Sequence, residues 1–171
     1  MKRPEPTEYA PYYKNYIDLV KVDNPIKALE DQIIAMQAFL SEIPEDRESY
    51  RYAANKWSIK EIIGHLIDTE RIFGYRALCI ARKDKTSFPG YDENAYVAAA
   101  NFDSRSFYDL VHEFSIVRES HLALFKSFAP EAFSEMGTAN QQPVSVRAIL
   151  FIMAGHEIHH LKVIRERYLN S

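Results

Sequence analysis

Two histidines near the C-terminus, His156 and His160, have the spacing of a pair of metal ligands on one helix. Residues four apart stand about one turn above each other on the same helical face. That face also carries Ile149, Met153 and Val163, so both imidazoles are expected to point into the core. Two inward imidazoles are what one helix contributes to a site for Zn²⁺ or a similar ion.

A stable site of this kind needs a third ligand. His65 lies at the edge of the apolar stripe of an earlier helical segment and can supply it if the two helices pack side by side. The alternative interpretation is a buried, hydrogen-bonded core histidine. Three inward histidines on two helices favour the metal site, because three ligands leave positions for water or a substrate.

The string His156-Glu157-Ile158-His159-His160 also fits the H-E-x-x-H pattern of zinc metalloproteases. Proteases of that kind combine the helix with a sheet, and the sequence shows no convincing strand. Glu157 points to another side of the helix and is not expected to act as a base. His159 lies on the shoulder of the inward face, where we expect it to line a pocket or to support the ligands.

Arg118 and His121 are polar residues on the apolar face of a third helical segment. A buried arginine must be paired, so we expect Arg118 to pair with Glu61 or Asp68 or to hold an anionic group of a substrate. The alternative is that its side chain reaches solvent. Glu61 or Asp68 is also a candidate to orient His65. His121 is expected to be a core or rim histidine.

Four long amphipathic segments must position these side chains. Apolar residues recur in each at spacings of three and four, and capping signals such as Asn24-Pro25 and the Ser58–Glu61 capping box mark their starts. The pattern predicts helices over residues 24–43, 58–83, 104–128 and 145–168, a short helix at 13–19, a loop at 85–94, and one short turn within 131–137 followed by a loop to residue 143.

The predicted fold class is therefore all-α, with a four-helix bundle as the best architecture. Five glycines in 171 residues are few for a protein rich in tight turns. Residues 1–22 contain three prolines and four tyrosines, which predicts an N-terminal arm that packs on the bundle. Residues 23–171 form the predicted bundle domain.

Composition narrows the class of protein further. Apolar residues make up 47% of the chain and the formal net charge is -3, so no nucleic-acid partner is expected. The single cysteine, Cys79, points to a reducing compartment, and we expect a cytoplasmic protein. The longest apolar stretch, residues 148–155, is far shorter than the roughly 20 residues of a membrane span, so no membrane partner is expected.

Two separated motifs resemble one known family. Residues 57–70 resemble the W-S-x-x-E-x-x-x-H-L-x-D-x-E segment of the DinB/YfiT-like superfamily, and residues 155–161 resemble its C-terminal G-H-x-x-H-H segment. Residues 88–92, F-P-G-Y-D, are similar to the loop after its second helix. The resemblance spans residues 25–168.

The resemblance implies an up-down-down-up four-helix bundle, usually a homodimer. It also implies a divalent metal, nickel or zinc, bound by His65, His156 and His160. Some relatives have a carboxylate or glutamine in place of one of these histidines. Activities in the superfamily include S-transfer with bacillithiol or mycothiol, a mycothiol-dependent isomerisation and metal-dependent hydrolysis.

We therefore expect a metal-dependent enzyme that activates water or a low-molecular-weight thiol toward a small-molecule substrate. The alternative is a non-catalytic, stress-related homodimer that binds a metal or another ligand, which a fourth protein ligand would favour. The substrate, the reaction, the metal and the dimer contacts are left open by the sequence.

Overall fold

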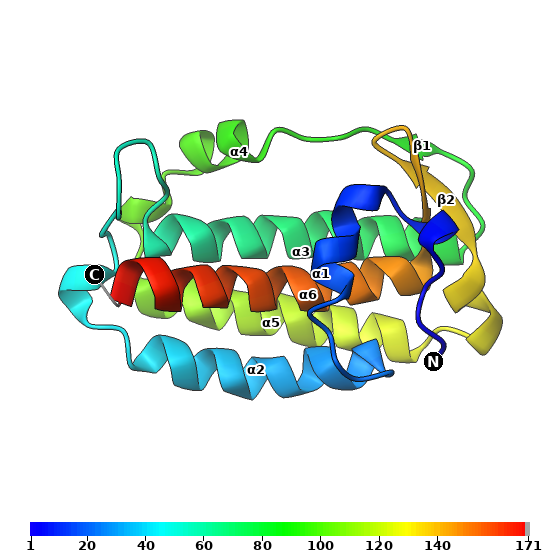
Figure 1. Cartoon of the computed structure of the whole chain (residues 1–171), viewed down its shortest axis with the longest axis horizontal. Coiled ribbons are helices and arrows are strands. Elements are labelled where there is room, and N and C mark those ends of the chain that lie inside the picture. The colour runs from blue at the N-terminus through cyan, green and yellow to red at the C-terminus, as the bar shows by residue number, and fades with distance from the viewer. Residues whose placement is uncertain (170–171) are drawn as a thin grey trace.

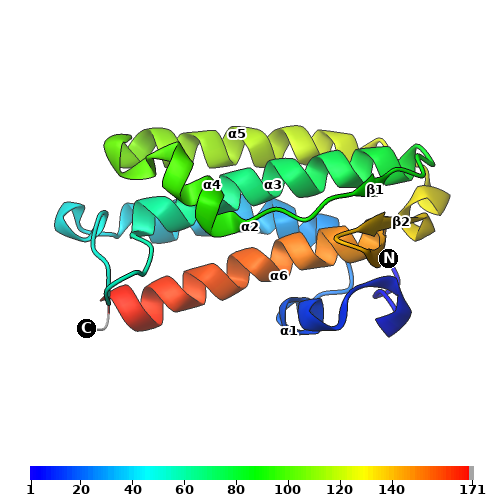
Figure 2. The ribbon, with the colours of Figure 1, turned by 90° about the horizontal axis from the view of Figure 1, so that it is seen from above.

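Four long helices lie side by side in the computed structural model, which describes residues 1–169 (Figures 1 and 2). Helix α3 packs against α5 and α6, and α2 packs against the same two helices. The chain is mostly helical, as the periodicity predicts. The four helices are α2 (Pro25–Ser41), α3 (Ile59–Ala81), α5 (Phe107–Lys126) and α6 (Val146–Ile164).

Side-chain caps explain where these helices begin. Ser58 accepts a hydrogen bond from the Glu61 amide while the Glu61 carboxylate accepts one from the Ser58 amide, the predicted capping box. The Ser106 side chain caps α5 by accepting a hydrogen bond from the Asp109 amide, so this helix begins slightly later than its apolar pattern suggests. Asn24 and Ser145 cap α2 and α6.

The inward faces of the helices form two apolar clusters, one toward each end of the bundle. The first includes Leu29, Phe125 and Phe151, and the second includes Met36 and Ile63, all of them fully buried. Burial of this apolar surface is the main favourable contribution to folding. Because the helices are fixed by packing at both ends, polar side chains between the clusters are held in defined positions.

Two predicted loops contain regular structure, which corrects the expectation of a chain without strands. Residues Asn140 and Gln141 both have positive φ angles, 50° and 61°, which is the requirement of a tight two-residue hairpin turn. Strand β2 pairs antiparallel with β3 and parallel with β1. Strands of two to four residues are too short to show a periodic pattern. They are β1 (Ser87–Phe88), β2 (Met136–Ala139) and β3 (Gln142–Ser145).

The connection between α3 and α5 runs back along the length of the bundle (Figure 1). It carries β1 and a helix that the sequence reading missed, α4 (Glu93–Ala100). Asp92 caps this helix at its start and Asn101, with φ of 51°, ends it in the left-handed conformation. None of the helices formed by residues 1–169 has the length and apolar character needed to cross a membrane.

The N-terminal segment lies against α6 through a short helix, α1 (Lys14–Ile17). The approach is close: a Cβ atom on Gly155 would lie 1.9 Å from the carbonyl oxygen of Tyr16. The Glu8 carboxylate accepts hydrogen bonds from Ser145 Oγ, at 2.7 Å, and from the Arg147 guanidinium. The segment is thus tied to the start of α6. Short 3₁₀ turns occupy Pro6–Glu8, Pro11–Tyr13, Glu45–Arg47, Phe102–Ser104 and Pro130–Ser134, and a π turn, Arg165–Leu169, follows α6.

Candidate metal centre

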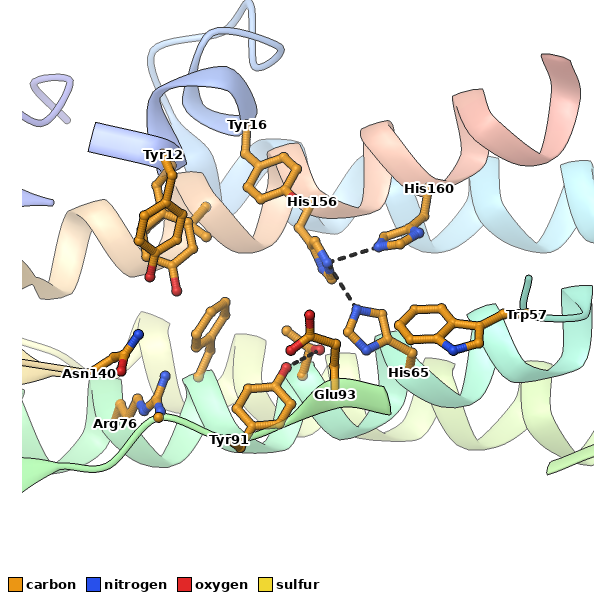
Figure 3. A pocket seen from close by; sticks show the side chains of 15 residues that line it. Tyr12, Tyr16, Trp57, His65, Arg76, Tyr91, Glu93, Asn140, His156 and His160 are labelled. Carbon is orange, nitrogen blue, oxygen red and sulfur yellow. Dashed lines mark hydrogen bonds between the residues drawn. The ribbon is translucent and has the colours of Figure 1, made fainter. Parts of the chain in front are cut away.

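The fold brings together the three histidines that the sequence singles out. His65 projects from α3, and His156 and His160 project from consecutive turns of α6 (Figure 3). The Nε2 atom of His156 lies 3.2 Å from Nε2 of His65 and 2.9 Å from Nε2 of His160. One ligand atom of each residue lies within 4.8 Å of the other two. The packing of α3 on α6 therefore places three imidazole nitrogens around one point.

The geometry of this histidine triad fits a divalent cation. Two nitrogens that share a tetrahedral zinc ion at about 2.1 Å stand roughly 3.4 Å apart, close to the two short separations observed here. The rings meet edge to face, with interplanar angles of 73°, 67° and 86°, so nitrogens rather than ring faces converge. Three converging imidazole nitrogens are an arrangement that a shared cation satisfies.

Burial keeps these imidazoles in the neutral form that metals bind. Loss of hydration lowers the pKa of His65 to about 4. Burial also lowers the pKa of His156 well below its usual value, and the neighbouring histidines lower it further. The pKa of His160 is depressed for the same reasons. Because a protonated imidazole cannot coordinate, all three side chains are ready to bind a metal near neutral pH.

Aromatic rings enclose the triad on two sides. The Trp57 ring lies 4.8 Å from that of His65 and stacks 6.5 Å from that of His160. On the other side, the Tyr16 ring packs edge to face against His156 and His159, at 5.3 Å from each. Such packing restricts the rotation of the imidazoles, which pre-organises the site.

A cavity of about 350 Å³ adjoins the triad, with all three of its histidines in the wall. Aromatic side chains from the N-terminal segment, including Tyr12 and Tyr16, cover one side, and Tyr91 lies on the other (Figure 3). The polar lining includes Arg76, Asn140 and Glu93. This volume is in the usual range for small-molecule sites. The cavity therefore gives a small molecule access to the converging nitrogens.

His159 lies outside the triad. Its ring packs on Tyr16 and lines a second cavity of about 290 Å³ on the far side of His160 and Trp57. Its pKa is lowered by partial burial and by the charge of Lys162. His159 thus lies beside the candidate ligands and is not one of the three histidines whose nitrogens converge.

Arg118 is buried deep in the bundle, and its partners differ from those expected. Its Nε atom donates to Glu70 at 2.7 Å and its Nη2 atom donates to Glu157 at 2.9 Å. The side chain is only 1% exposed, so it does not reach solvent. The expected pairing with Glu61 or Asp68 is wrong, because Glu70 faces the interior between α3, α5 and α6. Arg118 is therefore occupied by protein carboxylates and does not face the cavity.

The two carboxylates around Arg118 differ in proton affinity. Burial would raise the pKa of Glu70, but the charge and the hydrogen bonds of Arg118, together with the nearby His121, lower it overall. Burial dominates at Glu157 and raises its pKa to about 7, against the attraction of Arg118. The cluster spans α5, α3 and α6, and it fixes the rotation of α6 one residue away from His156.

Glu61 and Asp68 have other roles than the expected support of His65. Glu61 completes the α3 capping box and pairs with Arg51, which lowers the pKa of Glu61 against the effect of burial. Asp68 is partly buried, and this burial raises its pKa. In residues 1–169 neither carboxylate forms a hydrogen bond that would orient the imidazole.

His121 lies on α5, away from the triad. Its Nδ1 atom is 3.5 Å from a Glu70 carboxylate oxygen and its ring stacks on Phe125 at 5.9 Å. The side chain is 15% exposed. Its place at the rim of the core is the one expected from the sequence.

The sequence reading missed Glu93, the first residue of α4. Its carboxylate points into the cavity near His65 and Tyr91 (Figure 3). Burial is the main cause of the raised pKa values of Tyr16 and Tyr91, and the charge of Glu93 adds to both. The Asp92-Glu93 pair has the acidic character of a helix start, which is the signal that could have located α4. Only the path of the long connection brings it over the triad.

Fold and site together define a helical bundle with a candidate metal centre at a small-molecule cavity. The family model of the DinB superfamily matches residues 28–164, and the chain belongs to this superfamily.

The fold is also similar to a solved structure. That protein, YfiT from Bacillus subtilis, is described as a probable metal-dependent hydrolase with an unusual four-helix bundle topology. The match has a TM-score of 0.75 at 14% sequence identity and covers 98% of this chain and 91% of that chain. At this identity the likeness shows the fold. A search of curated proteins found no match.

Proposed function

We propose that this protein is a metal-dependent enzyme that binds a divalent cation through His65, His156 and His160 and acts on a small molecule in the adjoining cavity. The observation that carries the proposal is the convergence of three neutral imidazoles, within 4.8 Å of one another, in the wall of a 350 Å³ cavity. Nickel and zinc are the candidate metals, because both accept imidazole nitrogen readily.

A bound divalent cation supplies Lewis acidity that makes water or a thiol a nucleophile near neutral pH. The three histidines occupy one side of the site and leave the cavity side to water or substrate. Glu93 lies on that open side, where its carboxylate is placed to accept a proton from the nucleophile. Trp57 and Tyr16 shield the imidazoles from bulk water.

Hydrolysis is the reaction class we favour, since it needs only water beside the substrate. The description of YfiT as a probable metal-dependent hydrolase supports this choice for a chain of the same fold. Transfer of a low-molecular-weight thiol is the alternative. Turnover of an electrophilic substrate that is unchanged by added bacillithiol supports hydrolysis, and strict dependence on the thiol contradicts it.

Metal analysis of the purified protein tests the centre itself. After loading with nickel or zinc and removal of free ions, we expect about one ion per chain in the wild type and loss of most of it in His65→Ala and His156→Ala. His112→Ala is the matched control, because His112 is exposed on α5. No stoichiometric metal in the wild type, or equal binding by the triad variants, would contradict the proposal. If the protein binds one ion per chain but turns over no substrate, the metal site is supported and the enzymatic activity is contradicted.

We also propose an up-down-down-up order of the four long helices and a homodimer in the cytoplasm, as the resemblance implies. The lengthwise connection between α3 and α5 supports the helix order (Figure 1). Ile34 and Tyr108 are each 74% exposed and offer apolar surface to a partner copy. Light scattering on the purified protein tests the dimer, and a monomeric mass at micromolar concentration contradicts it.

A further inference from the structure

Arg76 is a buried cation that forms no ion pair with a carboxylate in residues 1–169. The residue is 6% exposed. Its Nη2 atom donates to the carbonyl oxygen of Pro89 at 2.6 Å, and its guanidinium lies 5.5 Å from the centroid of the Phe73 ring. A neutral carbonyl and a ring face compensate little of the cost of burying a charge. By contrast, the buried Arg118 and the partly buried Arg147 both have carboxylate partners.

The guanidinium of Arg76 lines the same cavity as the triad. Arg76 follows His65 by eleven residues on α3, which places it on nearly the same helical face and about 16 Å further along the axis. Figure 3 shows Arg76 and Asn140 at one end of the cavity and the three histidines at the other. The cavity therefore has a buried guanidinium at one end and the candidate metal centre at the other.

Much of the remaining wall of the cavity is aromatic. It includes the rings of Tyr12, Tyr13, Phe73 and Tyr91. Such a wall suits an apolar or aromatic body rather than a second charged group. The carboxylate of Glu93 lies toward His65, away from Arg76, so the potential along the cavity is positive at the Arg76 end (Figure 3).

We propose that the cavity selects small molecules with a terminal carboxylate or phosphate on an apolar or aromatic body. Arg76 binds the anionic group, the amide of Asn140 adds a hydrogen-bond donor, and the body lies along the tyrosines. The reacting end then reaches the triad, and this last point alone rests on the proposed function. Arg76 is thus a specificity residue for the substrate.

Titration calorimetry on the full chain, treated with a chelator to remove metal, tests the proposal. The probes are 3-phenylpropionate, phenyl phosphate and the uncharged 3-phenylpropan-1-ol. We expect the anions to bind the wild type at least about tenfold more tightly than the alcohol. Whichever anion gains more from Arg76 identifies carboxylate or phosphate as the preferred group.

Arg76→Met is expected to abolish the preference for the anions, and Arg76→Lys, which keeps the charge, is expected to retain part of it. Arg71→Met is the matched control and should bind like the wild type, since Arg71 is exposed on the same helix and pairs with Glu113. Thermal unfolding shows whether each variant is folded. If Arg76→Met does not fold, the anion preference of Arg76→Lys tests the role of Arg76 instead.

Equal affinity for acid and alcohol overturns the proposal, and so does an anion affinity that survives Arg76→Met. Absence of binding by all three probes also overturns it. The metal-free protein separates this inference from the proposed function. If the protein binds metal but does not prefer the anions, only this inference is contradicted. If it prefers the anions but binds no metal, only the enzymatic proposal is contradicted.

Discussion

Adjacent residues on α6 have different roles because one helical step turns the side chain by about 100°. The His156 imidazole faces the cavity, whereas the Glu157 carboxylate faces Arg118 in the interior. The ion-pair cluster therefore holds the turn that carries a candidate ligand. Arg118 in turn pairs with two buried carboxylates, and burying either of them without a counter-charge would be costly.

Arg118→Met is expected to lower the free energy of unfolding by about 3–5 kcal/mol, because it leaves Glu70 and Glu157 buried without their counter-charge. Urea denaturation at neutral pH measures the change. Arg71→Met, which removes an exposed ion pair, should cost no more than about 1 kcal/mol. Equal stability of the two variants would show that the cluster does not support the core.

At the scale of elements, the N-terminal segment matters to the site because Tyr12 and Tyr16 form one wall of the cavity. It is anchored where the Glu8 carboxylate meets Ser145 and Arg147 at the start of α6. Burial alone would raise the pKa of Glu8, but these hydrogen bonds and the arginine charge lower it to about 2. The anchor therefore depends on an ionised carboxylate.

The sign of this shift makes the anchor sensitive to acid. The folded pKa lies below the unfolded value of 4.5, so the stabilisation is complete above about pH 4.5 and is lost as the pH falls toward 2. Glu8→Gln should lower the free energy of unfolding by about 2–3 kcal/mol at pH 7. The difference from the wild type should shrink below pH 4.5. Urea denaturation at a series of pH values measures it, and a difference that is constant from pH 7 to 3 contradicts the assignment.

At the scale of the whole molecule, the triad joins two helices that are far apart in the sequence. A cation bound by His65 of α3 and by two residues of α6 would link them in the folded state only. Ligands that bind the native state alone stabilise it by mass action, by about 2.7 kcal/mol at one hundred times the dissociation constant.

Nickel or zinc at saturating concentration is therefore expected to raise the unfolding temperature of the chelator-treated protein by several degrees. His65→Ala should remove the shift, and His112→Ala should keep it. Scanning calorimetry provides the measurement. An identical shift in His65→Ala would mean that the metal acts elsewhere on the surface.

The sequence by itself determined the four long helices and the main candidate ligands. Caps such as Ser58 and the spacing of His156 and His160 are local features, and helical geometry converts them directly into structure. The small sheet and α4 were missed, because strands of a few residues carry no periodic signal and α4 lies in a stretch that reads as a loop.

Only the tertiary structure decided which side chains of different helices contact one another. Helical periodicity shows that Arg118 points inward, but it cannot show whether Glu61, Asp68 or Glu70 meets it, since that depends on how α3 and α5 are rotated against each other. The same holds for the approach of His65 to α6 and for the cavity end at Arg76. Faces of helices follow from short-range geometry, whereas contacts between faces follow from packing of the whole core.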